Sequence, residues 1–118
     1  MTSAKRKKTK PVTPYWQELV GVYFHFCWLK FNDIPTFDGS APRDLKYIVD
    51  ALQKRAEKAN VEWTLDNAKI RLNTFLHFAF KDKWLSENWI LSNINRQKDK
   101  IFYNIRKATP GQKEQPYN

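Results

Sequence analysis

The chain has 118 residues, enough for one domain and too few for two. Its 42% hydrophobic and 15% aromatic content excludes a wholly disordered chain, and its single cysteine excludes an internal disulfide and a thiolate-rich zinc site. Lys and Arg number 21 against 12 Asp and Glu, and this net charge of +9 points toward a polyanionic partner.

More than half of the positive charge lies at the start of the chain. Residues 1–13 contain five cations and no acid, so we expect a disordered basic arm that attracts phosphates without reading sequence; a purely solubilising tail is the alternative. The arm's cations are Lys5, Arg6, Lys7, Lys8 and Lys10. It has no apolar run typical of a secretory signal, and no stretch reaches the ~20 apolar residues that cross a bilayer. We therefore expect a cytoplasmic protein with no membrane partner.

The first helix is expected over residues 14–30. Thr13 can cap it and Pro14 suits its first position. Apolar residues occupy an arc of about 240° around this helix, which is typical of a helix covered by others. We therefore expect it to be central.

The second helix is expected over residues 42–59, after a loop that contains Pro35 and Gly39. Ser40 can cap it, and Asn60 can end it. One face carries an apolar stripe of Leu45, Ile48, Val49, Leu52 and Ala56. The other face is rich in cations, namely Arg43, Lys46, Lys54, Arg55 and Lys58.

The third helix is expected to begin after Thr64 as its cap and to run to about residue 85. Its main apolar face contains Leu65, Ala68, Leu72, Phe75, Leu76 and Ala79. A second, narrower stripe of Ile70, His77 and Trp84 lies nearly opposite. Two apolar stripes indicate either a helix covered on both sides or a docking seam.

The fourth helix begins somewhere in residues 86–92 and ends near residue 107. One row of residues, all apolar except Lys98, follows heptad-like spacing over barely two repeats, which suits either antiparallel packing within the chain or a homodimer. These positions are Leu91, Ile94, Lys98, Ile101 and Ile105. We thus expect an all-α protein: a compact bundle of about four helices over residues 14–107, with a flexible tail over residues 108–118.

We find no pattern of catalytic or metal-ligating residues. Three glycines cannot form a phosphate-binding loop, and the acids are scattered singly. His25 and Cys27 point about 200° apart on a helix and cannot chelate one ion together. Cys27 lies on the core face, which favours an apolar filler over a nucleophile. We expect no enzyme, no metal and no cofactor.

Two kinds of binding surface remain candidates. Fixed contacts to nucleic acid are expected from Lys54, Arg55 and Lys58 on the second helix and from Arg96 and Lys100 on the fourth, where Asn93, Asn95 and Gln97 could also reach base edges. Ordinary solvated helix faces are the alternative. The residues expected at a protein interface are Ile70, His77, Trp84, Trp89 and Ile101.

Six segments along the chain form a recognisable set: Tyr15-Trp16, Phe26-Cys27-Trp28, Asp44-Leu45-Lys46-Tyr47-Ile48, Asn73-Thr74-Phe75-Leu76, Asp82-Lys83-Trp84-Leu85 and Trp89-Ile90-Leu91-Ser92-Asn93-Ile94. Together they resemble the helical module at the C-terminal end of bacterial phage and plasmid replication-initiation proteins. The resemblance covers residues 14–107 and implies association with DNA or a replication complex, without catalysis. The winged-helix part that binds the origin in such proteins does not occur in this chain.

Two functions follow as hypotheses. The first is a nucleic-acid-associated module, with DNA favoured over RNA, linked to phage or plasmid replication. The second is a small accessory or inhibitor protein that docks on a nucleoprotein complex such as a CRISPR effector and can form a homodimer.

Overall fold

A computed structural model describes residues 13–108. The five cations of the basic arm, Lys5, Arg6, Lys7, Lys8 and Lys10, lie outside this range. Within it the chain forms helices and no strand, which confirms the all-α prediction. The helices are α1 (Trp16–Phe31), α2 (Ala41–Lys58), α3 (Leu65–Lys81), α4 (Lys83–Glu87), α5 (Leu91–Arg96) and α6 (Lys98–Ala108).

Helix α1 begins later and is less covered than predicted. Tyr15 adopts left-handed backbone angles (φ 61°) and precedes the helix without a side-chain capping bond, so Thr13 does not cap it. The buried side of α1 contains Leu19, Tyr23, Phe26 and Cys27. Its opposite side stays open, because Leu29 is 65% exposed and Trp28 is also exposed. The predicted apolar arc is therefore only partly buried in the described structure.

Helix α2 ends as the sequence suggested, but the prediction that Ser40 caps its start is wrong. Ser40 makes no capping bond to the backbone; its hydroxyl donates to Asp44 Oδ2 at 3.0 Å. The other Asp44 oxygen, Oδ1, accepts the Asn95 amide of α5 at 3.1 Å, so this buried carboxylate joins two helices. At the other end Asn60 takes left-handed angles just past the helix and reverses the chain, consistent with the predicted stop.

The predicted third helix is two helices. Helix α3 ends at Lys81 because Asp82 adopts extended backbone angles. The Asp82 carboxylate accepts the Leu85 N–H at 2.9 Å and so caps α4, while its second oxygen pairs with Lys100 Nζ of α6 at 3.0 Å. One residue thus ends α3 through its backbone, and its side chain caps α4 and pairs with α6.

The predicted fourth helix is also broken, into α5 and α6, at Gln97. The two pieces separate because they have different neighbours: α5 packs on α2 and α6 packs on α3. The heptad-like row of the predicted fourth helix faces the core, since Leu91, Ile94 and Ile101 are buried. Ile101, only 2% exposed, is a core residue, and its predicted place at a protein interface is wrong.

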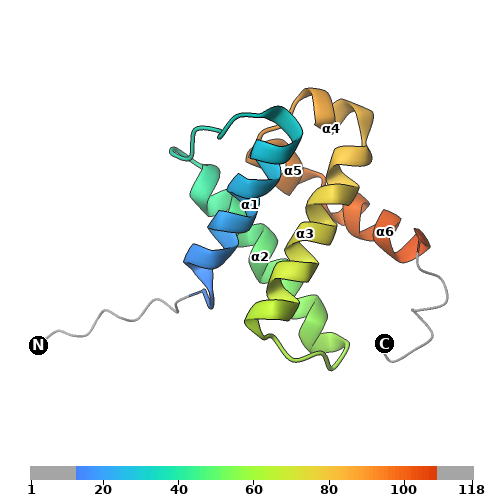
Figure 1. Cartoon of the computed structure of the whole chain (residues 1–118). Helices are drawn as coiled ribbons and strands as arrows, with labels where there is room; N and C mark the ends of the chain where they lie inside the picture. The colour runs from blue at the N-terminus through green and yellow to red at the C-terminus, as the bar shows by residue number, and fades with distance from the viewer. Residues whose placement is uncertain (1–12, 109–118) are drawn as a thin grey trace, which may run out of the picture.

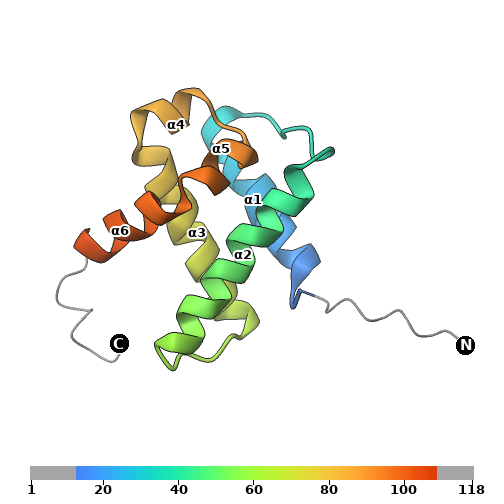
Figure 2. The same ribbon diagram turned by 180° about the vertical axis from the view of Figure 1, so that it is seen from behind.

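The helices lie on two sides of one core. Helices α1 and α3 lie side by side and run in the same general direction (Figure 1). Helices α2, α5 and α6 lie on the opposite side of the core, which faces the viewer in Figure 2. The α2 stripe predicted from the sequence, Leu45, Ile48, Val49, Leu52 and Ala56, is buried between them. No helix in residues 13–108 is both long enough and apolar enough to span a bilayer.

The role of Asp82 predicts a stability loss that depends on pH. We expect Asp82→Ala to lower the free energy of unfolding at pH 7 by about 1–2 kcal/mol, through loss of a helix cap and an ion pair. The Leu85 N–H, and next the Lys100 ammonium, hold the Asp82 pKa below the ordinary carboxyl value of 3.8. The stabilisation that the Asp82 carboxylate contributes is therefore fully present at pH values above 3.8. It declines as the pH falls and the carboxylate of the folded protein becomes protonated.

Urea unfolding at pH 7 and pH 3 measures this loss. Lys100→Gln is the matched control, because it removes the ion pair and keeps the cap, and it should cost less than Asp82→Ala. Equal stability of Asp82→Ala and wild type at pH 7 would contradict the assigned role.

Candidate nucleic-acid and protein interfaces

Cations gather where the C-terminal half of α2 meets α6. Lys54, Arg55 and Lys58 are all exposed on α2, as the sequence indicated. The Arg55 guanidinium carbon lies 4.3 Å from the centre of the Phe102 ring, so a cation–π contact joins α2 to α6. The last turn of α6 adds two exposed cations. We call this set the cationic face: Lys54, Arg55, Lys58, Arg106 and Lys107.

Two lysines of this face, Lys54 and Lys58, differ from the lysines of other surfaces. Ion pairs elsewhere neutralise Lys46 through Asp50, Lys83 through Glu87 and Lys100 through Asp82, each with a nitrogen–oxygen distance of 3.0 Å. Within residues 13–108, Lys54 and Lys58 form no ion pair. Lys100 pairs with Asp82, but its side chain is 58% exposed, so its contact with phosphate stays a prediction.

Helix α5 carries part of the predicted nucleic-acid contact set of the fourth helix. It has six residues and is too short by itself to lie along a groove of DNA. Its amides hold the fold: Asn93 donates to the Asn88 carbonyl at 2.9 Å and Asn95 donates to Asp44. Arg96 is exposed in the last turn of α5 and remains a candidate for a phosphate contact.

Trp89 belongs to a partly buried aromatic cluster. Its ring stacks on Phe26, with centres 5.5 Å apart and planes 23° apart, and it also contacts Phe31 and Phe80 at 5.8 Å. These rings come from α1, α3 and the segment between α4 and α5. Trp89 therefore packs within the chain, and its predicted interface role stays a prediction.

The polar groups beneath this cluster are Tyr23 and Cys27, both buried. Burial raises the pKa of the Tyr23 hydroxyl and of the Cys27 thiol, and the nearby Trp89 indole only partly opposes this. A raised pKa keeps Cys27 as a neutral thiol, which is unsuited to nucleophilic attack. The structure confirms the prediction that Cys27 is part of the core.

The predicted seam of Ile70, His77 and Trp84 is exposed but is not continuous. Ile70 is 62% exposed and His77 is exposed on α3, whereas Trp84 lies on α4, beyond the break at Asp82. Two separate surfaces replace the single stripe that a longer helix would have made.

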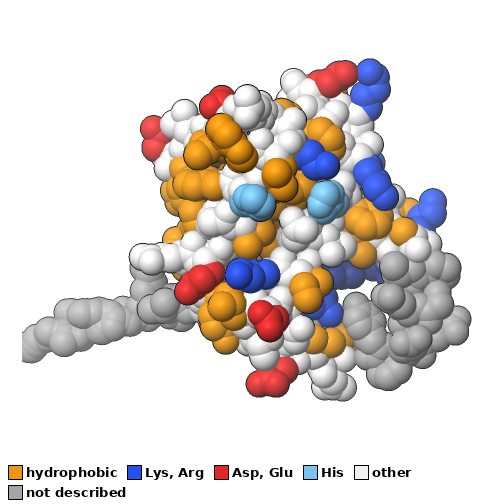
Figure 3. Space-filling model, in the orientation of Figure 1, with side chains coloured by type: hydrophobic (Ala, Val, Ile, Leu, Met, Phe, Trp, Pro, Cys, Tyr) orange, Lys and Arg blue, Asp and Glu red, His pale blue; other side chains and the backbone are white. Residues whose placement is uncertain are grey.

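A shallow groove between α1 and α3 was missed by sequence reasoning. It has a volume of about 510 Å³ and is lined by Glu18, Gly21, Val22, His25, Lys69, Ile70 and Asn73. We call it the α1–α3 groove. In the space-filling view both histidines, in pale blue, lie on this side of the molecule among apolar patches (Figure 3). The groove could be found only once α1 and α3 were placed relative to each other, because each helix provides only some of the lining residues.

His77 lies beside the groove with its ring edge-on to Phe26, the ring centres 5.0 Å apart. Desolvation, and then the charges of Lys30 and Lys81, lower the His77 pKa below its ordinary value. His77 is therefore uncharged at neutral pH. Nowhere in residues 13–108 do three His, Cys, Asp or Glu side chains group so that they could hold a metal ion.

Comparison of the chain with protein-family models, with curated proteins and with solved structures gives no match. The resemblance to replication-initiation modules therefore stays a prediction from the residues quoted above.

The burial of Cys27 predicts a slow thiol reaction. In the native protein at pH 8, we expect Cys27 to react with a disulfide reagent on the order of a thousandfold more slowly than in the urea-unfolded chain, since reaction requires opening of the core. Absorbance of the released thiolate measures both rates. As a control, a Cys27→Ser protein with Lys83→Cys on exposed α4 should react at the rate of a free thiol. A fast native reaction at Cys27 would show that the thiol is accessible.

Proposed function

We propose that this protein is a non-enzymatic module that binds nucleic acid, with DNA favoured over RNA, through its cationic face and its basic arm. The observation that carries the proposal is the set of exposed cations on α2 and α6, two of which, Lys54 and Lys58, form no ion pair within residues 13–108. Because each cation near a phosphate releases condensed counterions, such a face attracts a polyanion without a sequence code.

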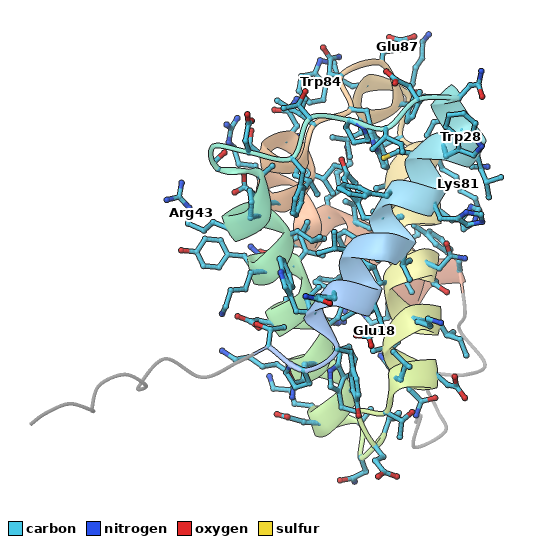
Figure 4. All side chains as sticks on the ribbon, turned by 60° about the vertical axis from the view of Figure 1, so that its left-hand side comes forward. Glu18, Trp28, Arg43, Lys81, Trp84 and Glu87 are labelled. Carbon is cyan, nitrogen blue, oxygen red and sulfur yellow. The ribbon has the colours of Figure 1, made fainter. Side chains whose placement is uncertain are left out.

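The geometry supports a preformed surface on two helices. The contact between Arg55 and the Phe102 ring joins α2 to α6, and both helices lie on the side of the molecule that faces the viewer in Figure 2. Arg43 adds a further exposed cation at the opposite end of α2, where its side chain extends away from the rest of the protein (Figure 4). A rigid surface of this kind loses little conformational entropy when it binds.

The resemblance to replication-initiation modules favours DNA over RNA and a role in phage or plasmid replication. A second candidate function is an accessory or inhibitor protein that docks on a nucleoprotein complex such as a CRISPR effector. The exposure of Ile70, His77 and Trp84 favours this candidate, since large apolar side chains in contact with water are typical of protein interfaces.

A salt series tests the proposal. We expect the full chain to bind a plain DNA duplex with an affinity that falls steeply as salt rises. In the Lys54→Gln/Lys58→Gln variant we expect the slope of log affinity against log salt to decrease by roughly 1.8, at about 0.9 per lost phosphate contact, and the affinity at 0.1 M salt to fall roughly tenfold. Fluorescence anisotropy of a labelled duplex measures both quantities.

Lys83→Gln is the matched control, since Lys83 is an exposed lysine of α4 already paired with Glu87. It should leave the affinity and the slope unchanged. Urea unfolding of each variant checks that the helices persist, because Lys58 also lies in the last turn of α2 and stabilises its carbonyl end. Absence of duplex binding at 50 mM salt would reject this proposal and leave the docking function as the better one.

A further inference from the structure

The α1–α3 groove has two walls of complementary charge. Glu18 lies in the first turn of α1 and Lys69 lies near the start of α3, and both line the groove. Neither forms an ion pair within residues 13–108. Figure 4 shows Glu18 where α1 and α3 run side by side. An acid on one wall and a base on the other thus remain unpaired.

The α1–α3 groove also contains a glycine, Gly21, that the fold itself does not require. Gly21 lies within α1, where glycine costs about 1 kcal/mol relative to alanine. A Cβ atom placed there would meet nothing within 4 Å, and Gly21 does not have the positive φ that favours glycine. Neither packing nor backbone angle explains this glycine. Glycine at such a place permits close approach of another backbone.

A second copy of this chain fits these features. If a two-fold axis runs along the groove, each α1 lies on the α3 of the other copy, because a two-fold contact pairs a patch with itself. Glu18 of each copy then faces Lys69 of the other, and Val22 faces the region of Ile70 and Asn73. His25 comes opposite His77 of the second copy.

We infer that the α1–α3 groove is a homodimer interface in which Glu18 and Lys69 pair twice across a two-fold axis around the apolar contact of Val22 and Ile70. The interface is small. Helix α1 has 16 residues and is about 24 Å long, so two adjacent helices offer about 500 Å² per copy. Stable complexes bury about 800 Å² per partner, and the dimer is therefore weak, with a dissociation constant in the micromolar range.

Sedimentation equilibrium of the full chain without nucleic acid tests the inference. We expect the apparent mass to rise from monomer toward dimer between about 1 and 300 µM. Ile70→Glu, at a site 62% exposed, should keep the chain monomeric throughout this range. Ile90→Glu is the matched control, since Ile90 is 55% exposed outside the groove, and it should dimerise as wild type does. A wild-type monomer at 300 µM, or a dimer that survives Ile70→Glu, would overturn the inference.

Charge reversal tests the pairing itself. Glu18→Lys alone and Lys69→Glu alone each place like charges across the axis, and each should raise the dissociation constant at least tenfold. An equimolar mixture of the two variants restores both attractive pairs and should form a heterodimer with wild-type affinity. A mixture no tighter than either variant alone would show that these residues do not meet across the axis.

The inference and the proposed function fail separately. The sedimentation experiment contains no DNA, and the duplex experiment alters only the cationic face, which shares no residue with the groove. If the protein is monomeric and binds the DNA duplex, the dimer inference is wrong and the proposed function stands. If the protein dimerises and does not bind the duplex, the proposed function is wrong and the dimer inference stands.

Discussion

The path of the last third of the chain depends on one carboxylate. Asp82 ends α3 through its extended backbone, caps α4 through one oxygen and pairs with Lys100 of α6 through the other. Without this turn α3 would continue along its own axis, and α6 could not return to pack on it. The return of α6 places Phe102 against Phe75 in the core and beneath Arg55 of α2. The cationic face therefore exists as a surface of two helices because the chain turns at Asp82.

The same arrangement separates two kinds of surface. Helices α2, α5 and α6 form one side, with the cationic face, and helices α1 and α3 form the other, with the apolar groove (Figures 1 and 2). A two-fold contact through the groove leaves both cationic faces uncovered. Two such faces on one dimer would raise the effective concentration of the second binding event on a single polyanion. Dimerisation would then raise the affinity for the polyanion, and binding to one polyanion would favour dimerisation, without any new contact.

Sequence patterns predicted the parts that depend on local spacing. The stripe on α2 was placed in the core because it repeats with the helical period, and Thr64 was placed as the cap of α3, where its hydroxyl accepts the Asn67 N–H at 3.1 Å. The breaks at Asp82 and Gln97 were missed, because a helical pattern continues through both residues. The ion pair between Asp82 and Lys100 joins residues that are distant along the chain, so no local pattern reveals it. Ile101 was placed outside for a similar reason: its neighbours come from other helices.

The central claim is that nucleic acid contacts the α2–α6 side of the molecule. Amide chemical shifts of the isotopically labelled full chain, followed during titration with a short DNA duplex at low salt, test it most directly. The account predicts that the largest shifts within residues 13–108 fall in the C-terminal half of α2 and the last turn of α6. Shifts concentrated on α1 and α3, or none at all, would contradict it.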